Sequence, residues 1–590
     1  MQIIYLKKTL TIAILALTFG ACKQSIQKII QPNKVTLDRK WWKEAIVYQV
    51  YPRSFKDSNG DGIGDLKGIN SKLDYIKSLG VDVVWLNPIY TSPNFDNGYD
   101  VSDYKNIMKD FGTMADFDNL LNGMHKRGLK LVMDLVVNHS SEKAEWFKQS
   151  RSSRTNKYRN YYHWWPAEKG KPTSRWSFFD VNSDAWQYDK PTNSYYLHYF
   201  AKQQPDLNWE NPLVRQDVYK IMRFWLDKGI DGFRMDAFQY VAKDTTWPAF
   251  PTGYELNIQK YYGNGPHLHD YLKEMNSEVL SKYDVMSVSE GAGTSPEEAL
   301  QFVDPARHEL NMAYHFEGMG IGLIGGGESH HMNPKGYNLL EFKKVYSTWE
   351  TGFEKKGWGT IYLGNHDQPR MVSRWGNDSS AFRETSSEML STFILTMGGT
   401  PYYYAGDELG MTNIRFNNLK DYRDISVINR AQHLKETGGN MAEFIETNKM
   451  MARDNGRTPF QWDSTANAGF TVGKPWLNVN PNYIKINVAA ENKVSTSPLN
   501  YFRKLTRLRK ENIALVYGKY KLLDKDNESI YAYTRELNGT RFLILLNFTS
   551  KSATAHTGIN LRKASVMIDN CNRLLKGEAL QPYEAVVYKL

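Results

Sequence analysis

From Trp41 onward, short apolar segments alternate with amphipathic helical segments, and this alternation constrains the fold more than any other feature of the chain. A helix after each strand returns the chain to the same edge of a sheet, so the alternation predicts parallel strands. We expect eight strands, at residues 46–50, 81–86, 131–136, 232–235, 285–288, 310–315, 360–363 and 402–404. Eight such units predict an α/β fold, a closed (β/α)8 TIM barrel.

Two further parts are expected beside the barrel. The connection after the third strand, residues 139–212, is unusually long and rich in Trp, Phe and Tyr. Long connections in a compact fold are usually functional or form a small domain, so we expect a small inserted domain over the barrel mouth. Alternating strands with polar turns predict a C-terminal antiparallel β-sandwich over residues 511–590. The barrel then comprises residues 41–138 and 213–510.

The N-terminus has the pattern of an export signal. Two lysines precede an apolar run at residues 10–19 that is too short to span a bilayer comfortably. The run ends in Phe-Gly-Ala-Cys22, which resembles the bacterial lipobox, in which the cysteine is lipidated. We expect a lipoprotein-type signal over residues 1–22, lipidation of Cys22, and a tether over residues 23–40. This predicts an exported protein in the bacterial periplasm or cell envelope, with ordinary cleavage before Cys22 as the alternative.

Composition excludes several kinds of partner. The formal net charge of +10 comes from 74 basic and 64 acidic residues, and no long basic block stands out. Since no nucleic-acid-binding motif accompanies this charge, no nucleic-acid partner is expected. The two cysteines, Cys22 and Cys571, cannot form a disulfide framework. No later segment is apolar enough for a transmembrane helix, so membrane contact is expected only through the lipid anchor, and the protein is expected to be a monomer.

Chemically active residues follow four of the predicted strands, at the end where TIM barrels place their active sites. These motifs are Asp134-Leu-Val-Val-Asn138-His139, Gly232-Phe-Arg234-Met-Asp236, Glu290, and Asn365-His366-Asp367. Any one of these motifs could be a solvated strand end. All four together, at the same face of an eight-strand pattern, are a specific signal of an active site.

Taken in this order, the motifs resemble those of the α-amylase-type glycoside hydrolases, and the resemblance covers nearly all of residues 41–590. It implies retaining cleavage of α-glucosidic bonds, with Asp236 as nucleophile and Glu290 as acid and then base. Glu290 must begin protonated, which neighbouring carboxylates and partial burial favour. Asp367 resembles the third carboxylate, which grips sugar hydroxyls. Arg234 precedes Asp236 by two residues on one strand, so it faces the same side and can keep Asp236 ionised.

A closer resemblance narrows the family. Gln204-Pro-Asp-Leu-Asn, Asn-Gly-Tyr99-Asp and Arg453-Asp-Asn-Gly-Arg-Thr-Pro-Phe-Gln-Trp resemble motifs of oligo-1,6-glucosidases and their relatives. His139 and His366 resemble the hydroxyl donors of the pocket for the terminal glucose.

In that subfamily the residues that Asp96 and Arg453 resemble close the pocket behind the terminal glucose, and the one that Tyr99 resembles stacks on it. A closed pocket implies an exo-acting α-glucosidase that takes small oligosaccharides. For the second arginine of the motif, Arg457, a purely structural role in the loop stays open.

Oxygen-bearing side chains alternate with glycines in Asp57-Ser-Asn59-Gly-Asp61-Gly-Ile63-Gly-Asp65. Such ligands suit a hard cation, and glycines allow the tight turn. The segment also resembles the calcium loop of the subfamily, which makes Asp57, Asn59, Asp61, Ile63 and Asp65 the expected ligands of one structural Ca²⁺. A polar β-turn loop without metal is the alternative. No organic cofactor is expected.

Three departures from the subfamily leave the linkage open between α-1,4 and α-1,6. Ala237 follows the nucleophile where oligo-1,6-glucosidases typically carry Val, and Ser289 precedes the acid where Gly is usual. The segment 179–186 replaces a shorter Gly-rich stretch. Because Ala237 leaves more room beside the leaving sugar, we expect a moderate preference for α-1,4-linked substrates such as maltose.

Other functions on the same fold remain possible. One is a transglycosylase of the trehalose synthase or sucrose isomerase type, although residues 369–375 do not resemble the Arg-rich loop of sucrose isomerases. A trehalose-6-phosphate hydrolase is another alternative, although an exported lipoprotein would rarely meet that substrate. A non-enzymatic binding protein of this fold would lack the catalytic residues, whereas this chain keeps all three carboxylates.

Overall fold

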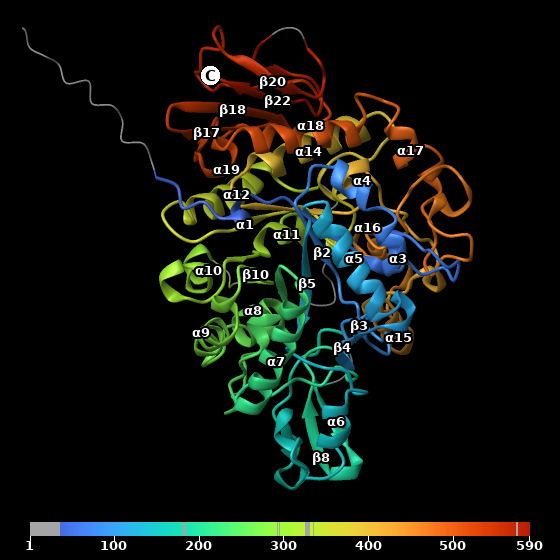
Figure 1. Cartoon of the computed structure of the whole chain (residues 1–590). Coiled ribbons are helices and arrows are strands. Elements are labelled where there is room, and N and C mark those ends of the chain that lie inside the picture. The colour runs from blue at the N-terminus through green and yellow to red at the C-terminus, as the bar shows by residue number, and fades with distance from the viewer. Residues whose placement is uncertain are drawn as a thin grey trace, which may run out of the picture. The chain divides into compact units, whose positions relative to one another are not determined.

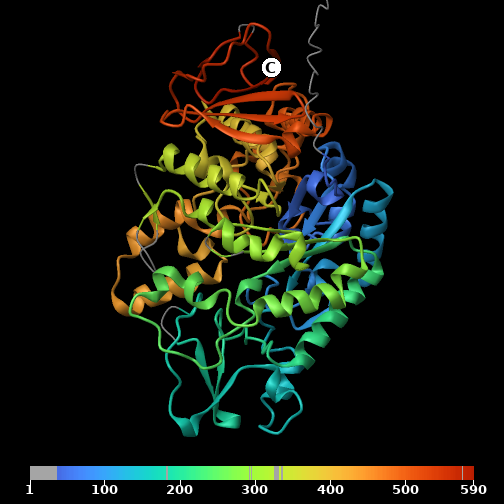
Figure 2. The ribbon, with the colours of Figure 1, turned by 90° about the vertical axis from the view of Figure 1, so that its left-hand side faces the viewer.

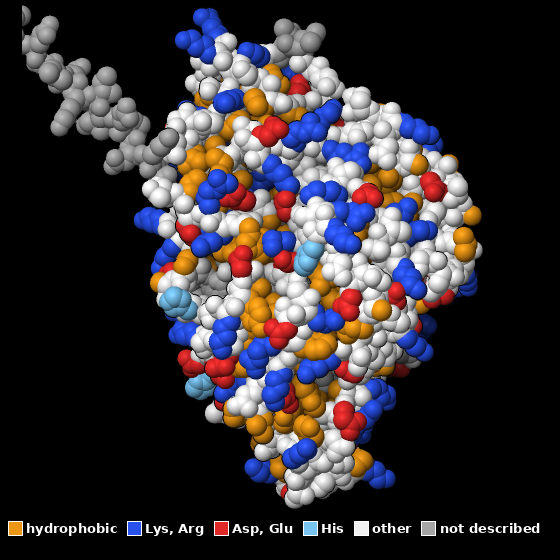
Figure 3. Space-filling view, in the orientation of Figure 1, with side chains coloured by type: hydrophobic (Ala, Val, Ile, Leu, Met, Phe, Trp, Pro, Cys, Tyr) orange, Lys and Arg blue, Asp and Glu red, His pale blue; other side chains and the backbone are white. Residues whose placement is uncertain are grey.

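The computed structural model describes residues 36–180, 184–291, 293, 295–324, 331–333, 336–573 and 576–590. The predicted export signal, Cys22 and most of the predicted tether lie outside the described residues. Within the described ranges no helix combines the length and hydropathy needed to cross a membrane. On the face in Figure 3, Lys and Arg side chains are interspersed with Asp and Glu, as expected for a solvated surface.

Eight parallel strands form the central sheet, in the order β11-β10-β9-β5-β2-β1-β15-β14 (Figure 1). Their bounds are β1 (Val47–Val50), β2 (Val83–Leu86), β5 (Lys130–Val136), β9 (Gly232–Asp236), β10 (Met286–Ser289), β11 (Met312–Ala313), β14 (Thr360–Ile361) and β15 (Thr400–Tyr404). A parallel bridge between Ala313 and Gly359 joins β11 to the residue before β14 and closes the sheet. The predicted TIM barrel is therefore confirmed, and every predicted strand overlaps an observed one.

The helices of the barrel cover the outside of the sheet. The longer helices are α5 (Met114–Lys126), α7 (Pro212–Lys228), α9 (Leu268–Glu278), α10 (Pro296–Val303), α12 (Leu339–Gly352), α14 (Arg383–Thr396) and α18 (Pro498–Glu511). Helix α7 illustrates the sequence signals: Asn211 caps its first turn, Pro212 begins it, and Gly229 ends it in a left-handed conformation with φ 104°. Since side chains fill the inside and helices cover the outside, strands such as β2 and β9 are buried along their whole length.

The inserted segment after β5 contains a three-stranded antiparallel sheet in the order β6-β8-β7. Its elements are α6 (Glu145–Ser150), β6 (Trp164–Pro166), β7 (Trp186–Asp189) and β8 (Ser194–Leu197). Bridges between His139 and Asp206, and between Tyr162 and Leu207, tie the two ends of the segment together next to the barrel. Figures 1 and 2 both show this segment at one end of the barrel, with the C-terminal strands at the other.

The C-terminal part is antiparallel, as predicted. Five strands pair in the order β16 (Lys519–Leu523), β17 (Ile530–Leu537), β18 (Thr540–Asn547), β22 (Ala585–Lys589) and β20 (Ser565–Asp569). Two short strands, β19 (Ala553–Thr554) and β21 (Ala579–Leu580), form a second small sheet. Along β17 and β18 side chains alternate between two apolar clusters, so that Phe542 packs toward the barrel and Leu543 into a separate core.

Candidate active site

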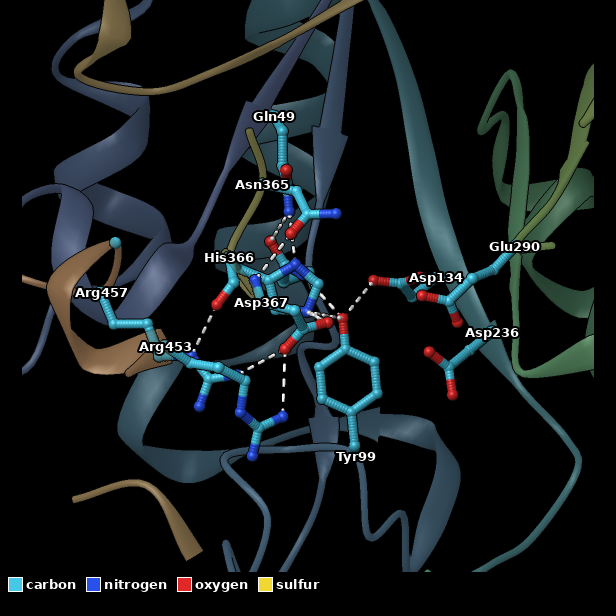
Figure 4. Close-up of polar contacts among 12 residues, drawn as sticks. Gln49, Tyr99, Asp134, Asp236, Glu290, Asn365, His366, Asp367, Arg453 and Arg457 are labelled. Atoms are coloured by element: carbon cyan, nitrogen blue, oxygen red, sulfur yellow. Dashed lines mark hydrogen bonds and ion pairs between the residues drawn. The ribbon is translucent and has the colours of Figure 1, made fainter. Parts of the chain in front are cut away.

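Three carboxyl groups meet at the ends of three neighbouring strands. Asp134 lies on β5, Asp236 ends β9, and Glu290 follows β10, and these strands are adjacent in the sheet. Arg234 Nη1 lies 2.8 Å from Asp134 Oδ1 and 2.5 Å from Asp236 Oδ1. Arg234 Nη2 pairs with Glu290 Oε1. One buried guanidinium therefore holds all three carboxyl groups, which Figure 4 shows clustered to one side of Tyr99.

A single cation cannot neutralise three buried carboxylates. Burial and the Glu290 carboxyl raise the pKa of Asp236 well above the usual aspartate value, and Arg234 offsets only part of this. Burial likewise raises the pKa of Asp134 to about 6, against the lowering effect of Arg234. Interacting carboxyl groups of this kind titrate as a coupled set, so Asp134 and Asp236 hold a proton more tightly than isolated aspartates do. The main-chain N–H of Ala237 donates to Glu290 Oε2 at 2.9 Å and orients that carboxyl.

Asp134 is enclosed by protein groups. It has no exposed surface, and its Oδ2 accepts hydrogen bonds from Trp85 Nε1 at 3.2 Å and from the Tyr99 hydroxyl at 3.1 Å. Asn87 Nδ2 in turn donates to the Tyr99 oxygen at 2.7 Å. Asp134 therefore orders the strand ends and the Tyr99 ring, while Asp236 and Glu290 keep some exposed side-chain surface.

The two histidines are buried and neutral. His366 lies parallel to Tyr99 with ring centroids 5.4 Å apart, and its Nε2 is 2.8 Å from the Tyr99 hydroxyl. The Nε2 atom of His139 lies 3.2 Å from Gln204 Nε2. Burial lowers the pKa of His366 and that of His139 to about 3. At neutral pH each ring therefore acts as a hydrogen-bonding group and not as a cation.

Asp367 faces two arginines on the other side of Tyr99 (Figure 4). Its Oδ1 lies 3.1 Å from Arg453 Nη1 and 2.7 Å from Arg457 Nη2. Although burial opposes it, the charges of Arg453 and Arg457 hold the pKa of Asp367 below the usual aspartate range. Asp367 is therefore ionised at neutral pH, and about 30% of its side chain stays exposed.

Asp96, in the segment that follows β2, lies next to Arg453 and near Asp367. Burial raises the pKa of Asp96 to about 7, although Arg453 and Arg457 lower it. Gln204 Nε2 donates to Asp96 Oδ2 at 3.1 Å. The other oxygen lies 3.8 Å from Arg453 Nη2 and has no hydrogen-bond partner among the described residues. A buried carboxylate oxygen that lacks a donor is suited to accept a sugar hydroxyl.

The nine residues that the sequence proposed for catalysis and substrate binding thus lie together: Asp96, Tyr99, His139, Arg234, Asp236, Glu290, His366, Asp367 and Arg453. Sequence reasoning left Arg457 open and missed Asp424. Arg457 is fully buried and holds Asp367, and Asp424 binds Arg453 at 2.6 Å and 2.8 Å. The shared motif with Arg453 was a signal for Arg457, whereas nothing in the pattern pointed to Asp424.

The predicted metal loop lies apart from this cluster, after β1. Asp57 Oδ1 accepts the N–H groups of Asn59 and Gly60, and both Asp57 and Asp65 are buried. Burial acts to raise the pKa of Asp57. Hydrogen bonds from the Thr471 hydroxyl and from main-chain N–H groups outweigh this effect, so the pKa of Asp57 lies below the usual aspartate value.

Neither Asp57 nor Asp65 forms an ion pair with any described residue. Their oxygens instead accept hydrogen bonds from main-chain N–H groups and from the Ser58 and Thr471 hydroxyls. Oxygen donors of this kind, together with Asn59, Asp61 and the Ile63 carbonyl, suit a hard cation such as Ca²⁺. In the described part of the chain, no three His, Cys, Asp or Glu side chains already form a metal cluster.

Comparison with known proteins agrees with this geometry. Residues 49–518 match the family model of the α-amylase catalytic domain. The chain is 49% identical to an oligo-1,6-glucosidase of Parageobacillus thermoglucosidasius, over 94% of this chain and 100% of that protein. It is 45% identical to an α-glucosidase of Pediococcus pentosaceus, over 93% and 99%. The crystal structure of an isomaltulose synthase from Klebsiella sp. LX3 superposes with a TM-score of 0.89 at 44% identity, covering 94% of this chain and 100% of that one. The chain therefore belongs to the α-amylase family and is a glycoside hydrolase.

Proposed function

We propose that this hydrolase is a retaining, exo-acting α-glucosidase that removes terminal glucose from short α-linked oligosaccharides. The observation that carries the proposal is the pairing of Asp236 and Glu290 on one buried arginine, with a third carboxylate, Asp367, held by Arg453 and Arg457. The α-glucosidase and oligo-1,6-glucosidase relatives support the same substrate class.

Each carboxyl has a distinct role in the proposed reaction. The Asp236 carboxylate attacks the anomeric carbon while Glu290 gives its proton to the departing glycosidic oxygen, so one C–O bond forms and another breaks. In the second step Glu290 takes a proton from water, the water oxygen attacks the same carbon, and the ester bond to Asp236 breaks. Two inversions retain the anomeric configuration. Arg234 stays bound to both carboxyl groups throughout and stabilises whichever one is ionised.

The end of the pocket supports exo action. Arg453 is held by Asp424, lies 3.8 Å from Asp96, and stacks with its guanidinium 5.2 Å from the Phe179 ring centre. These contacts fix charged hydrogen-bonding groups beside Asp367, and we propose that they end the pocket behind the terminal glucose. With Asp367, Arg453 and Asp96 would bind the hydroxyls of one terminal glucose.

The decisive experiment follows the products. Maltotriose digested by the enzyme should release glucose one unit at a time, and proton NMR at early times should show the α anomer first. Immediate release of the β anomer would contradict retention, and release of maltose from the interior of longer chains would contradict exo action.

We propose that the preferred linkage is α-1,4. Ala237 is buried among aromatic side chains next to the nucleophile, and its small side chain leaves room beside the leaving sugar. Several relatives bear the name oligo-1,6-glucosidase, which would favour α-1,6 linkages. The proposal of an α-1,4 preference therefore depends on Ala237 alone. Comparing kcat/KM for maltose, isomaltose, trehalose and sucrose decides it.

Hydrolysis is favoured over isomerisation by the loop after β14. Arg370 donates to the Ala405 carbonyl at 2.7 Å, and Arg374 donates to the Met319 carbonyl and to Gln368. Both arginines are buried, so neither is free to hold a released sugar in the pocket. If sucrose is cleaved at all, glucose and fructose should be the products, and an isomer of sucrose would overturn this assignment.

We also propose one structural Ca²⁺ on Asp57, Asn59, Asp61, Ile63 and Asp65. The two buried carboxylates, which form no ion pair with a described residue, support it, since a bound cation would neutralise them. The loop packs against residues 470–476: Asp57 N–H donates to the Phe470 carbonyl and Trp476 N–H donates to the Gly62 carbonyl. A cation here would stabilise the contact between the first barrel unit and that segment.

For localisation, we propose an exported, monomeric protein that is tethered through lipidated Cys22. The support is the lipobox-like end of the N-terminal apolar run. Mass spectrometry of the mature N-terminus and light scattering of the detergent-solubilised protein test the two parts of this proposal separately.

A further inference from the structure

A small cavity lies inside the barrel directly behind the acid Glu290. It is lined by barrel side chains that include Arg234, Glu290, Tyr314, Tyr362 and Tyr402, and its volume is ≈ 10 Å³. That is room for about one water molecule. The cavity is therefore large enough for a bridging water but too small for a sugar.

The three tyrosines that line this cavity differ in their hydrogen bonds. The Tyr362 hydroxyl donates to the His315 carbonyl at 2.9 Å, and the Tyr402 hydroxyl donates to the Met286 sulfur at 3.5 Å. The Tyr314 hydroxyl has no hydrogen-bond partner among the described residues. Burial raises the pKa of Tyr314 well above the usual tyrosine value, so this hydroxyl keeps its proton and remains a donor that lacks an acceptor.

A second donor in the same place is also unsatisfied. Arg234 Nη1 and Nη2 hold the three carboxyl groups, but the buried Nε of Arg234 has no partner among the described residues. Buried donors that border a cavity of this size are often satisfied by an ordered water. A water that accepts from Tyr314 and Arg234 keeps both of its own hydrogens for donation, and the Glu290 carboxyl is the acceptor that lines the cavity.

We propose that Tyr314 is a positioning residue for the acid–base group, and that it acts through one water in this cavity which bridges Tyr314, Arg234 Nε and Glu290. The inference rests on the proposed roles of Asp236 and Glu290. When Glu290 gives its proton to the glycosidic oxygen and the bond to the leaving sugar breaks, Glu290 becomes a carboxylate. The bridging water donates to that carboxylate, and Tyr314 orients the water.

The test compares two single-atom deletions in the same cavity, Tyr314→Phe and Tyr402→Phe. For Tyr314→Phe, kcat on maltose should fall about 3- to 10-fold, the effect of one hydrogen bond, while KM stays nearly constant. On p-nitrophenyl α-glucoside the loss should be smaller, because p-nitrophenolate leaves with little help from an acid. Tyr402→Phe, whose hydroxyl lies beside Tyr314 but donates to methionine sulfur, should cause a smaller loss that is the same on both substrates.

Equal losses on the two substrates for Tyr314→Phe would show a general structural effect and overturn the proposal, as would an equally large loss on maltose for Tyr402→Phe or unchanged kcat for Tyr314→Phe. A crystal structure of the unaltered enzyme gives an independent test that does not depend on how the variants fold. It should contain a water within hydrogen-bonding distance of both the Tyr314 hydroxyl and Glu290, and its absence would refute the inference. If the unaltered enzyme hydrolyses neither substrate, the proposed function fails instead.

Discussion

Replacing Asp96 with asparagine should stabilise the unliganded enzyme while weakening its hold on sugar. Burial raises the pKa of Asp96 from the ordinary 3.8 to about 7. This shift corresponds to about 4 kcal/mol in the free energy of unfolding when the carboxyl is ionised. Because the folded-state pKa is raised, wild-type stability falls as pH rises from about 4 to about 7, where the unfolded chain ionises first, and stays low above pH 7. Asp96→Asn removes this penalty, and about 4 kcal/mol is its upper limit because the amide must still fit the site.

Thermal unfolding of wild type and Asp96→Asn from pH 4 to pH 8 measures the effect. The Tm difference in favour of the variant should be near zero at pH 4, widen up to about pH 7 and then level off. Asp526→Asn, at an exposed carboxylate that forms no ion pair with a described residue, is the control and should leave Tm nearly unchanged at every pH. A variant that is less stable than wild type at pH 8 would show that ionised Asp96 is stabilised by Arg453, and the reasoning would be wrong.

The same substitution should impair catalysis through binding. Removing a charged hydrogen-bond acceptor for a sugar hydroxyl costs about 1.5–3 kcal/mol, so kcat/KM on maltose should fall about 10- to 150-fold. Stability and activity should therefore move in opposite directions, which is expected where a buried charge serves binding.

Four further outcomes are expected. Asp236→Asn should lose several orders of magnitude in turnover of p-nitrophenyl α-glucoside with an unchanged circular dichroism spectrum, and near-normal activity would remove its role as nucleophile. EDTA should lower Tm if the loop from Asp57 binds Ca²⁺, and elemental analysis that finds no metal would contradict this. Cys22→Ser should shift the protein from the membrane fraction to the soluble fraction, as followed by immunoblotting, and unchanged fractionation would argue against the anchor. Ala237→Val should move the kcat/KM ratio toward isomaltose by about 1–3 kcal/mol, and a shift toward maltose would show that this residue does not set linkage.

Much of the fold could be predicted because its signals are local. Short apolar segments between amphipathic helices located all eight barrel strands, and only their ends differ: the predicted strand at 310–315 is observed as Met312–Ala313. Strand ends depend on pairing with a neighbouring strand, and β11 pairs with β10 over two residues only. The positions of the strand ends are therefore set by tertiary contacts, and the local sequence carries no pattern for them.

The charge balance of the site was less predictable. The sequence suggested that Arg234 would keep Asp236 ionised, and the ion pair is present at 2.5 Å. However, Arg234 is shared with Asp134 and Glu290, so burial and the neighbouring carboxyl outweigh the pairing and raise the pKa of Asp236. The number of carboxyl groups around one cation depends on which strands are neighbours, and a single strand does not carry that information.

By itself, the sequence determined the barrel, the inserted and C-terminal parts, and the strand ends that carry Asp236, Glu290 and Asp367, because periodicity and motif spacing are properties of a continuous chain. Only the tertiary structure decided that Arg457 belongs to the site, since its partner Asp367 is 90 residues away in the chain. The same holds for Asp424 with Arg453, and for the unsatisfied Tyr314 hydroxyl behind Glu290. Such contacts arise when the sheet closes and brings distant loops to one rim, so their physical cause is the closure of the barrel and not any local preference of the residues.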